Sequence, residues 1–319
     1  MRNTRGFFFL VAICVLLHTP SLRAKDGWDR AILSLTEEND SGLSDRHYTQ
    51  GAQFMFLSQD HEAGSFVKNF PSIGYDVFRW KWGLEGGHLI FTPEAIEKTT
   101  LIRDDRPYAG WAYGGLIFQQ RGTNAYGSGV METFRVQAGM VGPSSQAEDI
   151  QVWWHHTFGF KRPNGWRHQL KDEAGVQFGY DRRHLYHLGE TWSAQFLPEI
   201  GVALGNVRTD LHAGGMLRFG YNIPNEFAVG ESSRGTDFGV YLFGSVRGQV
   251  VFLDIFLDGN NFRESHDVDK EPFIAEARIG IVFATRHLEL ALAHVQRTSE
   301  FDGQDSRDGF NSLTLTLKF

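Results

Sequence analysis

Apolar and polar residues alternate without a break over the last eight residues of the chain, Ser312 to Phe319. Leucines and then Phe319 occupy every second position, and Ser, Thr and Lys stand between them. Because successive side chains of a β-strand point to opposite faces, this segment predicts a strand with one apolar and one polar face. An amphipathic edge strand of a soluble sheet would show the same alternation. The terminal aromatic residue favours the closing strand of a bacterial outer-membrane β-barrel.

Similar alternating segments recur along the chain, with turn residues between them. Apolar residues occupy every second position from Phe134 to Met140 and again from Phe273 to Ile281. Such segments suit a barrel in lipid, where every backbone group must be paired within a closed sheet. One segment, Gly239–Asp258, can also be read as two short strands. The twelve predicted strands are Trp28–Glu38, Tyr48–Gln59, Gly87–Thr92, Ala109–Arg121, Val130–Val141, Glu173–Arg183, Ala194–Gly205, Asp210–Tyr221, Gly239–Asp258, Pro272–Ala284, His287–Thr298 and Phe310–Phe319.

The connections between these strands differ in length and chemistry. With the N-terminus in the periplasm, every second connection of an antiparallel barrel lies outside the cell. The first three of these are long or rich in polar residues: Asn39–His47, Pro93–Pro107 and Gly142–Asp172. On the periplasmic side, Asp60–Gly86 is long for a turn, and the sequence does not explain it. The expected fold is all-β, an antiparallel transmembrane β-barrel of about twelve strands with a short helix in an extracellular loop.

The N-terminal segment has the layout of a secretory signal peptide. Arg2 and Arg5 precede an apolar run from Phe7 to Leu17, which is too short to span a bilayer as a helix. We expect residues 1–24 to be removed after Ala24 and residues 25–319 to form the barrel. The single cysteine of the chain lies within the apolar run, so the mature protein would contain no disulfide.

Composition narrows the class of partner. The chain has 27 Phe and 36 Gly residues, as expected for aromatic girdles and crowded strand faces. Its formal net charge of −7 and the lack of a basic tract argue against nucleic acid as a partner. The expected location is the bacterial outer membrane, and the expected state is a monomer.

The third long loop carries residues suited to ester hydrolysis. Ser145 and Glu148 predict a capping box that starts a helix, on which Gln151 and His155, four residues apart, share one face. A histidine can deprotonate a water molecule, and each good donor to the oxyanion stabilises it by roughly 3 to 4 kcal/mol. No Gly-x-Ser-x-Gly motif occurs and no cysteine would remain in the mature chain, so a covalent acyl-enzyme would have no obvious nucleophile other than Thr49. We therefore favour direct attack by water with His155 as general base.

Two further positions in the loops could bind charged groups. Asp40 and nearby carbonyl oxygens could hold a hard cation such as Ca²⁺. Lys98 could bind a phosphate group or join the oxyanion site. Each residue also has a simpler interpretation, because Asn39 and Asp40 both favour turns and a single loop histidine often has no function.

Short motifs in the loops and their flanks carry a resemblance to a known family. They are Glu38-Asn39-Asp40, Asp45-Arg46-His47-Tyr48-Thr49-Gln50-Gly51, Asp105-Arg106-Pro107-Tyr108-Ala109-Gly110-Trp111, Gly142-Pro143, Gln151-Val152-Trp153-Trp154-His155 and Gly165-Trp166-Arg167-His168-Gln169-Leu170. In this order, and with the aromatic closing strand, they resemble the outer-membrane lipid A 3′-O-deacylase family over essentially the whole mature chain.

The resemblance implies a twelve-stranded barrel whose calcium-dependent active site opens to the outer leaflet. Such an enzyme removes the 3′-linked acyloxyacyl chain of lipid A, the lipid anchor of lipopolysaccharide. Where some relatives carry an acid six residues after the histidine, this chain has Lys161, so calcium would use another ligand or bind more weakly. The positions that match the family's site are Asn39, Asp40, Thr49, Lys98, Gln151 and His155.

Other functions fit the same pattern of strands. A porin or channel would use the polar lumen, and an outer-membrane phospholipase would use the same histidine and calcium chemistry. A barrel without activity, such as an adhesin, is a weaker alternative. Two ion pairs, Asp45-Arg46 and Asp105-Arg106, are expected to be structural. The aromatic residues Tyr108, Trp111, Trp153, Trp154 and Trp166 are expected to form an interfacial belt or line a lipid groove.

Overall fold

The computed structural model describes residues 30–39, 47–64, 67, 72–188, 192–227, 237–304 and 307–319. The predicted signal peptide, residues 1–24, lies outside this part of the chain, and so do Asp40 and the pair Asp45-Arg46. The proposed boundary between signal peptide and barrel therefore stays a prediction.

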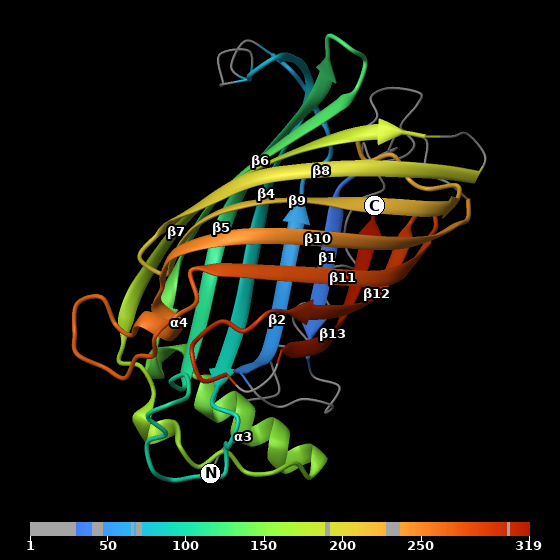
Figure 1. Cartoon of the computed structure of the whole chain (residues 1–319). Coiled ribbons are helices and arrows are strands. Elements are labelled where there is room, and N and C mark those ends of the chain that lie inside the picture. The colour runs from blue at the N-terminus through green and yellow to red at the C-terminus, as the bar shows by residue number, and fades with distance from the viewer. Residues whose placement is uncertain are drawn as a thin grey trace.

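Twelve antiparallel strands close into a single β-barrel (Figure 1). The pairing of β2 with β4 closes the barrel, while β3 is a two-residue strand that pairs with the N-terminal part of β4. The predicted fold class and strand number are confirmed. The strands are β1 (Ile32–Glu38), β2 (His47–Leu57), β3 (His61–Glu62), β4 (Tyr75–Thr92), β5 (Ala109–Asn124), β6 (Gly129–Val141), β7 (Glu173–His187), β8 (Trp192–Gly205), β9 (Arg208–Tyr221), β10 (Gly239–Asp254), β11 (Phe273–Ala284), β12 (Leu288–Arg297) and β13 (Asp308–Lys318).

The third barrel strand corrects one prediction. It begins at Tyr75 rather than at Gly87, so the second part of the long connection that the sequence left unexplained, from Tyr75 to Gly86, is strand. Three glycines, Gly83, Gly86 and Gly87, occupy this part of β4, and residues without side chains cannot show an alternating pattern. The segment that could be read as two strands is the single strand β10, followed by the short helix α4 (Ile255–Asp258).

The long connections 93–108 and 142–172 lie at one end of the barrel together with the helices α3 (Ala147–Phe158) and α4, and we call this the α3 end (Figure 1). None of the helices in the described residues is long and apolar enough to cross a membrane. The predicted capping box is absent. Ser145 donates its hydroxyl to the carbonyl of Gly142, and Gln146, with a φ of 62°, precedes α3 without capping it through its side chain.

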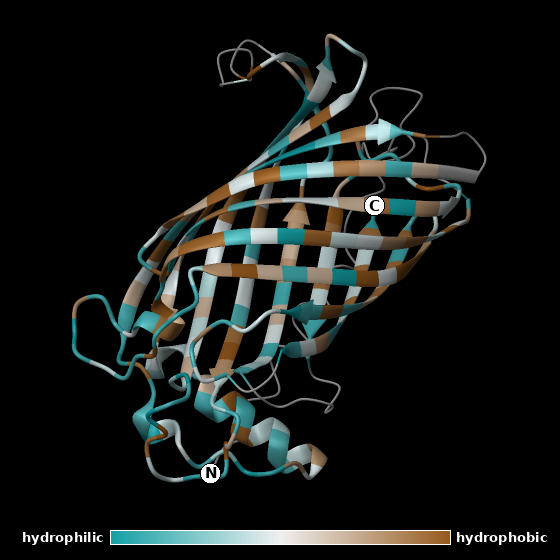
Figure 2. Ribbon diagram, in the orientation of Figure 1, coloured by the Kyte–Doolittle hydropathy of each residue, from teal (hydrophilic) through white to brown (hydrophobic). Residues whose placement is uncertain are grey.

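Brown and teal residues alternate along the strands, as an apolar outer and a polar inner face require (Figure 2). Inside the α3 end, however, the lumen is filled by buried apolar side chains, which we call the apolar plug. Helix α4 contributes to this plug, and the ring of its Phe256 stacks on Phe91 of β4 at 4.2 Å. The plug consists of Tyr48, Phe91, Ala109, Trp111, Val141, Leu170, Val207, Ile255, Phe256, Val295 and Phe310.

Candidate active site

Helix α3 lies against the outer wall of the barrel. Phe91 of β4 faces inward to the apolar plug, so its neighbour Ile90 faces outward. Ile90 is nonetheless fully buried, because it packs in a cluster with Ala147 of α3 and with Trp166. Its partner in β5 is Gly110, where an added Cβ would come within 2.2 Å of the Cβ of Ala147. The first turn of α3 can therefore approach the wall closely.

Gln151 and His155 lie on the buried face of α3. Their exposed fractions are 2% and 3%, whereas the next residue, His156, is exposed. The expectation that they share one face is thus confirmed. Ala147, on the same face, packs on the outer wall, and Gln151 is bound to Trp166 of the same cluster. We infer that both side chains face the lipid side of the sheet and not the lumen.

One ring nitrogen of His155 has a defined role. Nδ1 donates a hydrogen bond to the main-chain carbonyl of Lys161, because a carbonyl oxygen can only accept. The other nitrogen, Nε2, then carries a lone pair in the neutral ring, as a general base requires. The Lys161 side chain points elsewhere and lies 3.8 Å from Glu97. Position 161 therefore orients the histidine through its backbone, which any side chain would permit.

The amide of Gln151 is held in one orientation. The indole N–H of Trp166 donates to Oε1 of Gln151 at 2.8 Å, and because an indole nitrogen can only donate, the bonded amide atom must be the oxygen. Nε2 of Gln151 is buried and has no hydrogen-bond partner among the described residues. A buried amide donor without a partner is costly, so such a group often serves a ligand.

Asn39 and Thr49 come together at the rim of β1, β2 and β4. Asn39 has a φ of 70° and donates its side-chain amide to the carbonyl of Tyr48. Thr49 sits at an irregularity in the pairing of β2 with β4 and shares a hydrogen bond of 2.6 Å with Thr92. Thr92 follows Ile90 by two residues and so belongs to the wall on which α3 rests. Thr49 is thus placed on the wall against which α3 rests, and Asn39 lies beside it at the rim.

Lys98 is exposed, and the backbone around it lies against the segment that follows α3. The amide of Asn164 donates to the carbonyl of Ile96 at 2.8 Å, and a Cβ on Gly165 would lie 3.1 Å from the Lys98 carbonyl. The two long connections are therefore packed together beside α3. This arrangement brings the Lys98 segment to the loop that carries His155.

The rim around Asn39 and Thr49 offers amide, hydroxyl and carbonyl oxygens, the donor type that Ca²⁺ prefers. Asp40, the expected metal ligand, follows directly in the sequence. The residues present therefore fit a hard cation in the chemistry of their donors.

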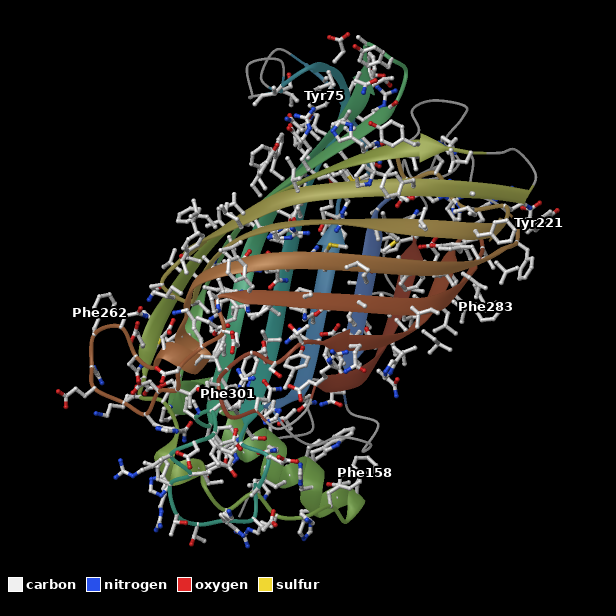
Figure 3. The ribbon with its side chains drawn as sticks, viewed as in Figure 1. Tyr75, Phe158, Tyr221, Phe262, Phe283 and Phe301 are labelled. Carbon is white, nitrogen blue, oxygen red and sulfur yellow. The ribbon has the colours of Figure 1, made fainter. Side chains whose placement is uncertain are left out.

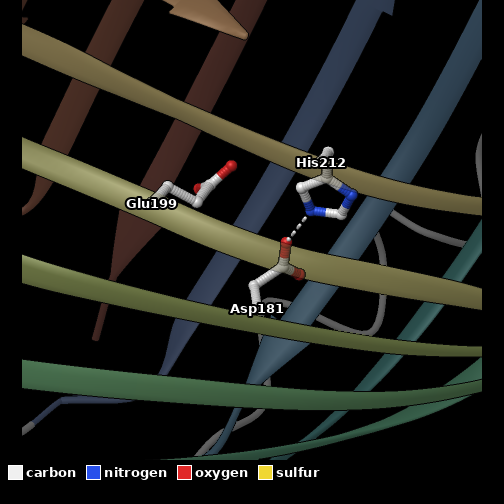
Figure 4. Close-up of side chains that lie close together, drawn as sticks. All are labelled: Asp181, Glu199 and His212. Atoms are coloured by element: carbon white, nitrogen blue, oxygen red, sulfur yellow. Dashed lines mark hydrogen bonds and ion pairs between the residues drawn. The ribbon is translucent and has the colours of Figure 1, made fainter. Parts of the chain in front are cut away.

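A different group in the described part of the chain has the spacing of a metal site, namely Asp181, Glu199 and His212 in the lumen (Figure 4). His212 donates a hydrogen bond to the Asp181 carboxylate at 3.0 Å, and Glu199 pairs with both Arg183 and Arg247. Each member is thus already engaged by neighbouring protein groups. We interpret the group as part of the ionic network that fills the polar lumen.

The aromatic prediction is correct only in part. Tyr108, Trp111 and Trp166 are buried, so they belong to packed clusters and not to an interfacial belt. Trp153 is 60% exposed, as expected for contact with lipid. The role of Trp166 in orienting Gln151 was missed by the sequence reasoning, and only its place within a shared motif could have signalled it.

The predicted ion pair between Asp105 and Arg106 is not formed. Arg106 does not pair with Asp105 but with Glu300, at 3.0 Å. Asp105 instead accepts hydrogen bonds from the backbone amides of Glu94 and Arg106. Both residues are structural, as expected.

Comparisons with known proteins agree with this architecture. A model of the family described as "Outer membrane protein LpxR" matches residues 9–319. The solved structure of LpxR from Salmonella typhimurium is similar with a TM-score of 0.72 at 17% identity, covering 90% of this chain and 100% of that one. The β-domain of the Bordetella autotransporter BrkA aligns with a TM-score of 0.47 at 12% identity, covering 91% of this chain and 99% of that one. No curated protein matches the sequence.

The match extends over nearly the whole chain and includes every strand of the barrel. It confirms the resemblance inferred from the loop motifs and the location in the outer membrane. The chain belongs to the LpxR family of outer-membrane β-barrel proteins.

Proposed function

We propose that this protein is a calcium-dependent hydrolase that removes the 3′-linked acyloxyacyl chain from lipid A in the outer leaflet. The observation that carries the proposal is the setting of His155. It is buried beside Phe160, and its Nδ1 donates to the Lys161 carbonyl, so that in the neutral ring Nε2 is the nitrogen with the lone pair that a base needs. Family membership supports lipid A as the substrate, and the position on the outer wall suits a substrate that stays in the membrane.

The chemistry begins when His155 Nε2 accepts a proton from water, which attacks the ester carbonyl. The oxyanion that forms needs donors already in place, and the unpartnered Nε2 of Gln151 is such a donor. Collapse of the tetrahedral intermediate expels the sugar alkoxide, which recovers the proton from His155. Lys98, exposed beside the same loop, supplies positive charge for a glucosamine phosphate.

Ca²⁺ would be held by Asp40 with oxygens of Asn39 and Thr49, and when bound it would polarise the ester carbonyl. The chain's own residues define the rest of the site. Thr49 is held by Thr92 and Asn39 by the Tyr48 carbonyl, so both enter the site with fixed orientations. In this proposal the α3 end faces the outside of the cell, where long barrel loops normally lie, and the protein acts as a monomer.

The test is mass spectrometry of lipid A from cells that express the wild type, His155→Ala or His156→Ala, each with calcium or with chelator. We expect the wild type and His156→Ala to release the 3′ acyloxyacyl mass in calcium, since His156 is exposed on another face of α3. His155→Ala and chelated samples should retain it. An unchanged lipid A profile with folded wild-type protein would refute the substrate, and phospholipid products in the same extracts would indicate a phospholipase.

A further inference from the structure

Four aromatic side chains form a continuous row that starts beside His155, and we call it the aromatic row. The ring of Phe160 lies 5.8 Å from the His155 ring and 6.3 Å from Phe158. Phe158 in turn lies 4.4 Å from Trp154, and Trp154 lies 6.1 Å from Trp153. Figure 3 shows Phe158 at the free end of α3, away from the barrel strands.

The aromatic row is largely uncovered. Trp153, Phe158 and Phe160 are exposed by 60%, 55% and 41%. Adjacent exposed aromatic side chains of this size mark a surface that binds an apolar partner. On the same helix Gln151 and His155 are buried, so the exposed aromatic side chains lie next to the two candidate catalytic groups.

The position of the row indicates which apolar partner it meets. α3 rests on the outer wall of β4, and farther along that wall Phe54, Trp82 and Leu84 point outward with 43–46% exposure. These wall residues face the hydrocarbon of the membrane. The row therefore continues the lipid-facing surface beyond the rim of the barrel. Directly after Phe160 come the exposed cations Lys161 and Arg162, placed to meet anionic headgroups.

We propose that the aromatic row is the seat for an acyl chain of an outer-leaflet lipid and guides that chain to His155. The identity of the lipid rests on the proposed function, whereas contact with acyl chains does not. A chain lying along Phe160, Phe158 and Trp154 would bring its ester to the base at one end of the row. Because a longer acyl chain would contact more of these rings, the length of the row would determine how strongly long chains are preferred over short ones.

Contact with lipid can be measured without catalysis. Cys14 is the only cysteine of the chain, so Phe158→Cys in a Cys14→Ser background carries one label. The full chain would be labelled with bimane and reconstituted in phosphatidylcholine vesicles with brominated acyl chains. We expect at least twofold quenching at position 158 and little at the matched control Glu148→Cys, which is exposed in the first turn of α3 and does not neighbour any ring of the row. Equal or absent quenching at the two positions would overturn the proposal.

Phe160→Cys replaces the first variant if that one does not fold, as judged by heat-modifiable migration. A second measurement compares the KM of wild type and Phe158→Ala for lipid A with long and short secondary chains. For the long-chain substrate, Phe158→Ala should have a KM at least fivefold higher than that of the wild type, while its kcat should change little. Quenching without any hydrolysis by the wild type would retain the lipid seat and reject the proposed function. Hydrolysis without quenching would reject the lipid seat and retain the proposed function.

Discussion

A single hydrogen bond determines what the Gln151 side chain offers to a substrate. Trp166 donates to the amide oxygen, and therefore the amide nitrogen, buried and unpartnered, is the atom left to act. The sequence predicted Gln151 and His155 on one helical face because that follows from helical spacing alone. It could not predict Trp166, fifteen residues farther on, because their contact depends on how the loop after α3 folds back.

At this scale we predict the effect of Trp166→Phe, which keeps a buried ring but removes the indole N–H. The Gln151 amide is then free to rotate, and kcat should fall about tenfold. This loss is smaller than the factor of about 10² or more in kcat that removal of an oxyanion donor itself causes. KM should change little. Steady-state deacylation in detergent micelles measures both constants. Trp82→Phe, on the outer wall away from α3, is the control and should retain full activity; an equal loss in both variants would contradict the assigned role.

Among the elements, α3 depends on a close approach to β5. Its first turn is not started by the predicted capping box, because Ser145 turns its hydroxyl back to Gly142 and Gln146 adopts a left-handed backbone. What fixes the helix is instead the missing side chain at Gly110, together with Ile90. The alternating pattern revealed most strands, but neither the glycine-rich start of β4 nor this helix-to-wall contact is visible in a pattern of side chains.

We therefore expect Gly110→Ala to inactivate the protein while the barrel still forms. The new methyl group would lie 2.2 Å from Ala147 Cβ and 2.3 Å from Ser145 Oγ, so α3 must move away from the wall. The expected outcome is at least a tenfold loss of deacylation with normal heat-modifiable migration. Gly114→Ala on the same strand is matched to it, because its nearest atom would be 3.9 Å away. Full activity in Gly110→Ala would show that the seating of α3 is unimportant.

For the whole molecule, the lumen is a packed interior at the α3 end. The apolar plug is bordered by Arg106 and Arg297, which pair with Glu300 at 3.0 and 3.2 Å. Such filling gives the porin alternative little support. The sequence indicated that charges would lie inside, but Arg106 and Glu300 are 194 residues apart, and only the closed barrel brings them together.

The pairing of Glu300 predicts how stability depends on pH. Burial alone would raise the pKa of Glu300, but Arg297 and Arg106 outweigh it and lower the pKa from its ordinary value of 4.5 to about 2. The stabilisation is therefore fully present above about pH 4.5 and is lost as the pH falls through about 2. At pH 7, Glu300→Gln should lower the free energy of unfolding by about 3 kcal/mol, because it leaves buried guanidinium groups uncompensated.

Urea unfolding in detergent at pH 7, 4 and 2.5 would measure the difference between wild type and Glu300→Gln. This difference in the free energy of unfolding should become steadily smaller as the pH falls to 2.5. The exposed Glu264→Gln provides the comparison and should match the wild type throughout. A difference that stays constant with pH would mean that the pairing of Glu300 is not its cause.

The placement of His155 outside the sheet also determines the kind of kinetics to expect. A site on the outer wall meets its substrate by diffusion in two dimensions, so the effective concentration is the mole fraction of substrate in the leaflet and not its amount per volume. Under the proposed function, diluting lipid A with inert lipid should therefore slow the reaction even at constant bulk concentration. The cell could regulate such an enzyme through the composition of its membrane, without any change in the protein.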